Sequence, residues 1–97
     1  MIVYVSIGNS DDKLSQLRWA AFYATVNSCI LTARGYEKMH GRWMSDPTAW
    51  WQNACWCFEI RDSDMEFLKK DLRSMAQEFN QDSIAWAQAP VTEFLSP

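Results

Sequence analysis

The sequence predicts an α+β fold, a two-layer sandwich with two helices on one face of a mostly antiparallel sheet. Two segments, residues 14–33 and 65–79, repeat apolar side chains at the three- and four-residue spacing of amphipathic helices. Short apolar or alternating segments indicate strands at residues 2–7, 54–60, 83–87 and 91–95. The expected order is β-α-β-α-β-β, and helices gathered on one face would bury both stripes.

The first strand and the first helix follow directly from the start of the chain. Residues 2–7 are almost wholly apolar, which is typical of a central strand covered on at least one face. Ser10, Asp11 or Asp12 are expected to cap the helix, because acidic side chains suit its positive end. Gly35 is expected to end it. The apolar stripe comprises Trp19, Phe22, Tyr23, Val26, Cys29, Ile30 and Ala33.

The second half of the chain starts with a segment in which the apolar residues follow neither helical nor strand spacing. Residues 36–53 are expected to form a loop, with a short strand around 40–44 as the alternative. Ser63 and Glu66 match a capping box at the start of the second helix. A ferredoxin-like arrangement is the nearest common topology, but the expected final hairpin, with a turn at 88–90, leaves the strand order open.

Composition limits both the fold and the function. Ninety-seven residues allow a single core, so residues 1–97 are expected to form one domain. The net charge of −3 argues against a duplex nucleic-acid binder, which usually has a basic surplus. No segment has the ~18 apolar residues of a membrane span. The missing basic start and the odd cysteine count favour reduced thiols in the cytoplasm, the host cytoplasm if the protein is phage-encoded.

The loop after the first strand is the first candidate binding site. Asn9, Ser10, Asp11 and Lys13 stand where a strand ends and a helix begins, a place that ligands favour. The carboxylates suit the hydroxyls of a ribose or sugar and would repel a bare phosphate. The alternative is plain capping and turn chemistry, for which these residue types are equally suited.

The second candidate is the tryptophan-rich segment before the middle strand. Trp51 could stack on a base or sugar ring while Gln52 and Asn53 hydrogen-bond to its edge. We expect this segment to face the first loop, so that Asn9, Asp11, Trp51 and Gln52 line one cleft. The alternative is that the tryptophans cover a thin core.

The third candidate is the connection between the second helix and the strand after it. Gln81 and Asp82 offer polar groups there, although a connector needs no function. If the first strand and the strand at 83–87 are antiparallel neighbours, we expect these residues at the opposite end of the sheet from Asn9.

The positions of the cysteines and of the histidine in the sequence give little support to metal binding or catalysis. Cys29 lies in a helix stripe, and Cys55 and Cys57 have no second cysteine pair with which to hold zinc. Nothing in the sequence brings His40 to a cysteine, and no serine elbow or carboxylate pair is present. We therefore expect no metal, no cofactor and no catalytic residue, and an enzyme ranks behind the binding functions.

Four segments carry a resemblance to known proteins: residues 5–14, 40–43, 51–56 and 81–86. They resemble small uncharacterised proteins of bacteriophages, prophages and actinobacteria, and more distantly a bacterial family of unknown function. That family has an Asn-Pro pair where this chain has Asn9 and Ser10. The resemblance implies a phage-linked setting and no particular reaction.

Two functions follow from these observations. In the first, the protein binds a polar, ring-bearing small ligand, nucleotide- or sugar-like, in phage–host conflict. In the second, it is a phage-encoded inhibitor that blocks a host or defence protein through an acidic, tryptophan-rich face. The oligomeric state stays open.

Overall fold

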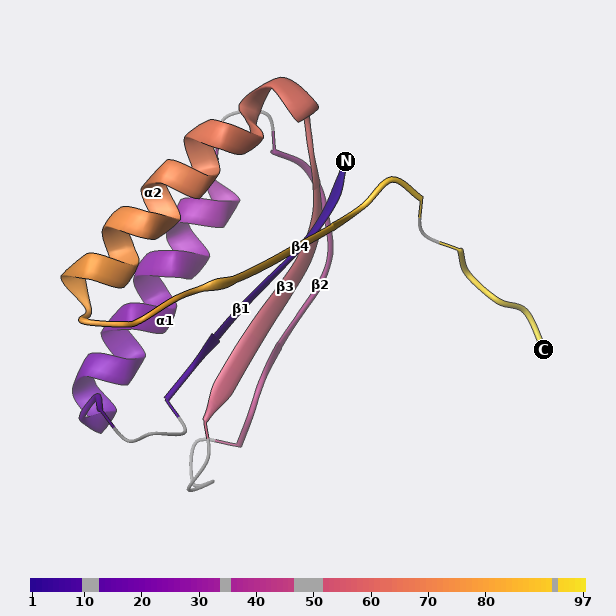
Figure 1. Ribbon diagram of the computed structural model, residues 1–97. Coiled ribbons are helices and arrows are strands. Elements are labelled where there is room, and N and C mark those ends of the chain that lie inside the picture. The colour runs from indigo at the N-terminus through magenta and orange to yellow at the C-terminus, as the bar shows by residue number, and fades with distance from the viewer. Residues whose placement is uncertain (10–12, 34–35, 47–51, 92) are drawn as a thin grey trace.

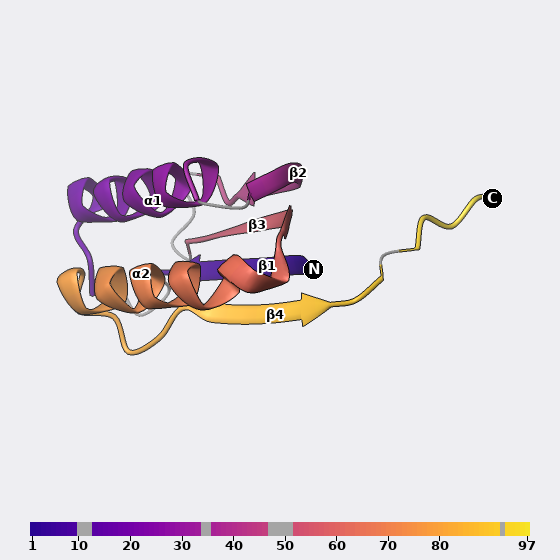
Figure 2. The same ribbon diagram turned by 90° about the horizontal axis from the view of Figure 1, so that it is seen from above.

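The computed structural model describes residues 1–9, 13–33, 36–46, 52–91 and 93–97, and it has the expected α+β two-layer architecture (Figure 1). Both helices lie on one side of the sheet (Figure 2). The elements in chain order are β1 (Ile2–Gly8), α1 (Gln16–Leu31), β2 (Tyr36–Met44), β3 (Asn53–Ile60), the short 3₁₀ helix η1 (Asp62–Asp64), α2 (Met65–Glu78) and β4 (Ala85–Ala89).

The sheet has four strands in the order β2-β3-β1-β4, and every neighbouring pair is antiparallel. A β-α-β-β-α-β chain with this strand order has the ferredoxin-like topology. The two central strands, β1 and β3, are the most deeply buried, and the exposed edges belong to β2 and β4.

One strand lies elsewhere than the sequence predicts. Residues 36–44 form β2 and not a loop, and its alternation is obscured because two irregularities interrupt its pairing with β3. Residues 91 and 93–97 form no strand: Val91, Phe94 and Leu95 are exposed, and within the described chain no strand beyond the edge strand β4 pairs with them. The expected turn at 88–90 is also wrong, because β4 continues to Ala89.

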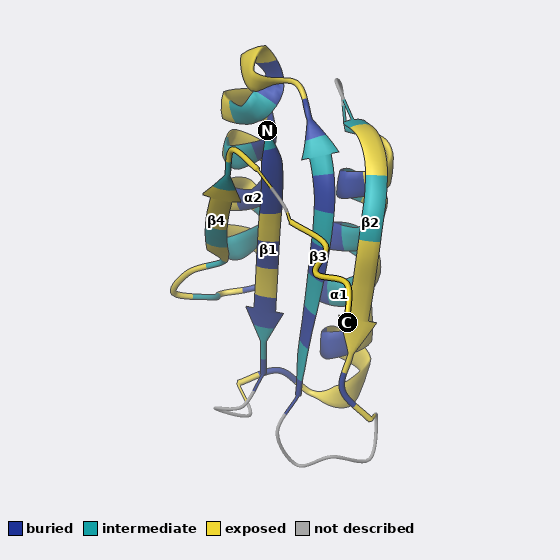
Figure 3. Cartoon of the chain, turned by 90° about the vertical axis from the view of Figure 1, so that its right-hand side faces the viewer, coloured by how far each residue is buried: buried dark blue, intermediate teal, exposed yellow. Residues whose placement is uncertain are grey.

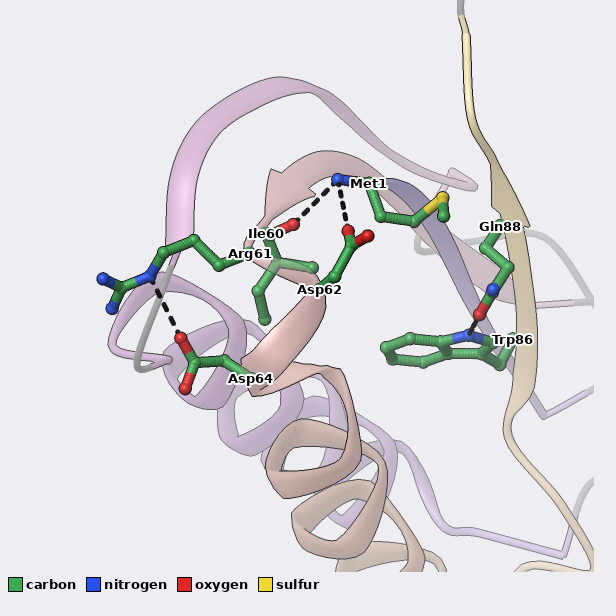
Figure 4. A network of polar contacts seen from close by, with 7 residues as sticks. All are labelled: Met1, Ile60, Arg61, Asp62, Asp64, Trp86 and Gln88. Atoms are coloured by element: carbon green, nitrogen blue, oxygen red, sulfur yellow. Dashed lines mark hydrogen bonds and ion pairs between the residues drawn. The ribbon is translucent and has the colours of Figure 1, made fainter.

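The helix starts differ from the expected caps. α1 is capped by Ser15, whose hydroxyl oxygen accepts from the Arg18 amide at 3.2 Å, so the helix begins after the predicted cap residues. The expected capping box at Ser63 is replaced by η1. There the Asp64 carboxylate lies 3.1 Å from Arg61 Nε, whereas the Met1 nitrogen donates to the Ile60 carbonyl and lies 3.2 Å from Asp62 Oδ1 (Figure 4).

The core lies between the helices and the helix-facing side of the sheet; buried residues alternate with exposed ones along most of β1 and with half-buried ones along β3 (Figure 3). It is formed mainly by Val3, Val5, Ile7, Trp19, Phe22, Val26, Ile30, Trp56, Phe58, Ile60, Leu68, Leu72 and Phe79. The alternation along 54–60 and the helical spacing in 65–79 predict that Trp56, Phe58, Leu68 and Leu72 are buried, and the structure confirms it. The apolar phase of residues 83–87 also predicts Ile84 and Trp86 in the core, but both are only half-buried, because they lie on and beside the edge strand β4.

Asn80 ends α2 in the left-handed conformation, with φ of 55°. The Gln81 amide donates to the Ala76 carbonyl at 2.8 Å and the Asn80 amide to Gln77 at 3.1 Å, which is a Schellman cap.

We expect Asn80→Ala to lower the free energy of unfolding by about 1 kcal/mol, because a Cβ-bearing residue without a polar side chain tolerates this conformation poorly. Asn80→Gly should equal or exceed the parent, since glycine adopts positive φ without strain. Urea unfolding of both variants checks this, and equal stability of the two variants would contradict the cap.

Candidate functional site

A buried amide network joins the end of β1 to the residue before β3. Asn9 is 1% exposed and Gln52 is 3% exposed. The Asn9 backbone amide donates to the Gln52 carbonyl at 2.8 Å, and Asn9 Nδ2 donates to Gln52 Oε1 at 3.0 Å. Asn9 also bonds both backbone groups of Leu14, accepting from its amide at 2.9 Å and donating to its carbonyl at 3.0 Å. The two segments that we expected to face each other therefore meet at these residues.

The network continues onto α1. The side-chain amides of Gln16 and Gln52 exchange two hydrogen bonds, of 2.7 and 3.1 Å. Nearby, Asn53 is held by backbone contacts to Ser45, whose hydroxyl accepts from the Asn53 amide at 3.1 Å. Because Asn9 and Gln52 use their polar atoms within the protein, they close this end of the sandwich and present little to a ligand. Of the predicted site residues, Ser10, Asp11 and Trp51 lie outside the described residues.

An ion pair links the start of α1 to the connection before β4. Lys13 Nζ lies 3.3 Å from Asp82 Oδ2. β1 and β4 are antiparallel neighbours, yet Gln81 and Asp82 share an end of the sheet with Asn9, so the expected separation was wrong. The physical reason is that antiparallel pairing places the start of one strand beside the end of the other, as Ser6 opposite Ala85 shows.

A groove opens at this same end, between the second half of α2 and the chain that leads into β4. Its volume is about 550 Å³. Its apolar part consists of Leu72, Ala76 and Ile84, and its polar part of Arg73, Gln77, Asn80, Gln81, Asp82 and Ser83. Two of the sequence-predicted site residues, Gln81 and Asp82, thus line one groove. The residues that line it with them, such as Arg73 and Gln77, are not among the predicted site residues.

A second hollow of about 280 Å³ continues this groove along β4 and shares Leu72, Arg73 and Ile84 with it. Its far end is formed by Lys69 and Trp86. Lys69 Nζ lies 5.3 Å from the centre of the indole ring, a cation–π distance. The indole projects from β4 on the side of η1 and α2, and its Nε1 donates to Gln88 at 2.9 Å (Figure 4). We call the two hollows together the α2–β4 groove.

Some of the charged side chains around the α2–β4 groove form ion pairs with other residues of the protein. Asp82 pairs with Lys13, and Lys69 lies 3.3 Å from Glu66. Arg73 has no ion-pair partner within the described part of the chain. A guanidinium in this setting can bond an anionic or carbonyl oxygen of a ligand.

Sequence reasoning missed Arg73 and Gln77 as candidate site residues. The available signal was their spacing, since Lys69, Arg73 and Gln77 recur every four residues and therefore line one face of α2 beside Gln81. These residues lie outside the apolar stripe of the helix, so the stripe by itself assigns them no role.

Cys29 lies in the helix layer, whereas Cys55, Cys57 and His40 lie in the sheet, on β3 and β2. Burial, and secondarily Asp71, raises the pKa of Cys29 on α1 to about 11, so this thiol stays protonated at neutral pH and is a poor nucleophile. His40 Nε2 lies 3.2 Å from Glu59 Oε1, without hydrogen-bond geometry. Within the described ranges, no three His, Cys, Asp or Glu residues are grouped so that they could hold a metal ion.

Among the described residues, neither helix has the length and apolar character needed to cross a membrane. No family model, no curated protein and no solved structure matches this chain.

Proposed function

We propose that the protein binds a polar, ring-bearing small ligand, nucleotide- or sugar-like, in the α2–β4 groove. The observation that carries this proposal is that apolar side chains and polar side chains converge on one elongated hollow at an end of the sheet, among them Arg73, which has no ion-pair partner among the described residues. A volume of about 550 Å³ lies within the range of small-molecule sites, which usually combine apolar contact with a few fixed polar groups.

The apolar side of the groove suits a ring. Leu72 and Ile84 line both hollows, and Trp86 stands at one end with its indole only partly covered. A planar base or the apolar face of a sugar can pack on such a surface, since aromatic and aliphatic side chains supply contact area with little entropy cost.

The polar side suits hydrogen bonding to a charged ligand. Gln81 Nε2 donates to the Phe79 carbonyl at 3.2 Å, which fixes the amide and leaves its oxygen as an acceptor. Gln77 adds a second amide, and Arg73 adds a cation that lacks an ion-pair partner among the described residues. Since the cation favours a negative ligand, a nucleotide fits the groove better than a neutral sugar does.

The resemblance to phage and prophage proteins supplies the proposed setting, phage–host conflict, in which a small protein that sequesters a nucleotide-like signal would be of use. That setting rests on the resemblance alone, whereas the ligand class rests on the groove.

Native mass spectrometry of the purified protein, followed by titration with nucleoside monophosphates and with a neutral hexose, tests the proposal. We expect a copurified small molecule or saturable binding of at least one monophosphate. Arg73→Gln should weaken that binding by about tenfold or more, the usual cost of a lost charge-assisted hydrogen bond. The matched control is Lys70→Gln, which removes a cation from the same helix outside the groove.

Two outcomes would contradict this function. One is a stoichiometric host protein in place of a small molecule, which would favour an inhibitor of protein partners. The other is nucleotide binding that falls equally in Arg73→Gln and Lys70→Gln, because that would reflect net charge and not the groove.

A further inference from the structure

We propose that the outer edge of β4 binds an extended, acidic segment of a partner protein, which adds to the sheet as a further strand. β4 has β1 on one side, and within the described part of the chain no strand pairs with its other side. The C-terminal segment does not cover this edge. It leaves β4 toward β2, where Phe94 stacks on the His40 ring at 6.3 Å between ring centres (Figure 3).

The hydrogen bonds of the sheet show which backbone groups of β4 point outward. At the start of β1, Met1 and Ile60 exchange both of their backbone hydrogen bonds, at 2.9 and 3.0 Å. Because such pairs recur at every second residue of an antiparallel ladder, the odd-numbered residues of β1 bond β3 and the even-numbered ones bond β4. The even-numbered residues lie opposite the three alanines of β4, so the N–H and C=O groups of Trp86 and Gln88 point away from the sheet.

The two edges of the sheet differ in the features that normally prevent strand addition. β2 carries Glu37, Lys38, His40 and Arg42, and two irregularities interrupt its pairing with β3. Charges and bulges of this kind keep an edge strand from accepting another strand. β4 has no charged residue and pairs with β1 without a register shift, and Pro90 directly after it limits the open edge to the strand itself. β4 is therefore the edge that can accept a strand.

An added strand would place every second side chain beside α2. α2 and β4 lie next to each other along the α2–β4 groove, which Lys69 and Arg73 line from the helix. These two residues are four positions apart, a rise of about 6 Å along the helix. Alternate residues of a strand are separated by about 6.7 Å. Two acidic side chains with one residue between them would therefore match both cations.

The charges on this side favour an acidic segment over a second copy of this chain. Arg73 has no ion-pair partner among the described residues. Lys69 pairs with Glu66, which is 77% exposed, and such a surface pair is weak. A second copy that paired through its own β4 would bring Trp86 and Gln88 to this side, and neither is charged. Carboxylates of a different protein would instead pair with the cations.

Fluorescence anisotropy with a labelled octapeptide of alternating valine and glutamate tests the proposal. We expect saturable binding, and binding at least about tenfold weaker for the peptide that has lysine in place of glutamate. Gln88→Pro should weaken binding of the glutamate peptide at least about fivefold, because it removes an outward N–H that the added strand needs. The matched control, Gln88→Ala, loses the same side chain but keeps the N–H, and should bind as the parent does.

Gln88→Pro also separates this proposal from nucleotide binding. The fold should tolerate the substitution, since proline is accepted on an edge strand where its nitrogen faces solvent. Gln88 lines neither hollow of the α2–β4 groove, so the variant should bind a nucleoside monophosphate as the parent does. The two proposals can therefore fail independently.

Amide hydrogen exchange of the unmodified protein gives a second readout. The N–H groups of Trp86 and Gln88 should exchange fast in the free protein and slowly with the glutamate peptide, while that of Ala87, which faces β1, stays slow throughout. Absence of saturable binding, or binding that leaves both outward amides unprotected, would overturn the proposal. Protection of these amides without peptide, rising with protein concentration, would also overturn it and assign the edge to a second copy.

Discussion

Trp56→Ala should lower the free energy of unfolding by about 3–5 kcal/mol, the largest effect expected of any single substitution in this chain. Trp56 is completely buried on β3. Its ring stacks on Tyr23 of α1 with ring centres 5.4 Å apart, and its Nε1 donates to Asn27 Oδ1 at 2.9 Å. The substitution would therefore leave a cavity between sheet and helix and also remove a hydrogen bond that joins the two layers.

Chemical denaturation at low protein concentration, where association contributes nothing, gives the measurement. Trp43→Ala is the matched control, because Trp43 lies on the side of the sheet turned away from the helices and is 51% exposed, so its loss should cost less than about 1 kcal/mol. Trp56→Phe should fall between the two, since it keeps a ring but not the N–H donor. Equal losses for Trp56→Ala and Trp43→Ala would mean that the side of β3 that packs on the helices has been misassigned.

The fold class could be predicted because the buried elements carry strong periodic signals. Along β3, Trp56, Phe58 and Ile60 alternate with half-exposed residues, and α1 buries Phe22, Val26 and Ile30 at helical spacing. These patterns arise from burial on one side, which is also what determines the two-layer architecture.

The edge strands could not be assigned in this way. β2 is exposed along most of its length, and its register with β3 shifts twice. Its sequence therefore shows no regular alternation of apolar and polar residues. Conversely, Val91, Phe94 and Leu95 have the composition of a strand but no neighbour with which to pair, since β4 is the edge and the chain leaves the sheet after Ala89. Composition indicates a strand only where the fold supplies a partner.

The candidate site shows the same division between local and long-range information. The sequence predicts that Asn9 and Gln52 meet, but as the lining of a ligand cleft; in the structure they meet as buried amides that bond each other. The α2–β4 groove did not follow, since it depends on how far the edge strand diverges from α2, a distance that no residue type encodes. Arg73 and Trp86 become neighbours of one hollow only through that packing.

The last prediction concerns the amide network and distinguishes a structural Asn9 from a ligand-binding one. Asn9→Ala should lower the free energy of unfolding by about 3 kcal/mol. The substitution leaves the buried amide and carbonyl of Leu14 without their partners, and each unsatisfied buried group costs about 1–3 kcal/mol. Gln52 Oε1 would keep only the bond from Gln16, at 3.1 Å.

Urea unfolding of Asn9→Ala, Gln52→Ala and the double variant should give a coupling energy of about 1 kcal/mol or more, because the two side chains bond each other directly. Asn53→Ala is the matched control: the hydrogen bonds that Asn53 makes to Ser45 use its backbone, so the change should cost less than about 1 kcal/mol. A loss below about 1 kcal/mol for Asn9→Ala, with zero coupling, would contradict a structural network. Asn9 would then be free to bond a ligand, and the binding site would belong at the end of β1 instead of between α2 and β4.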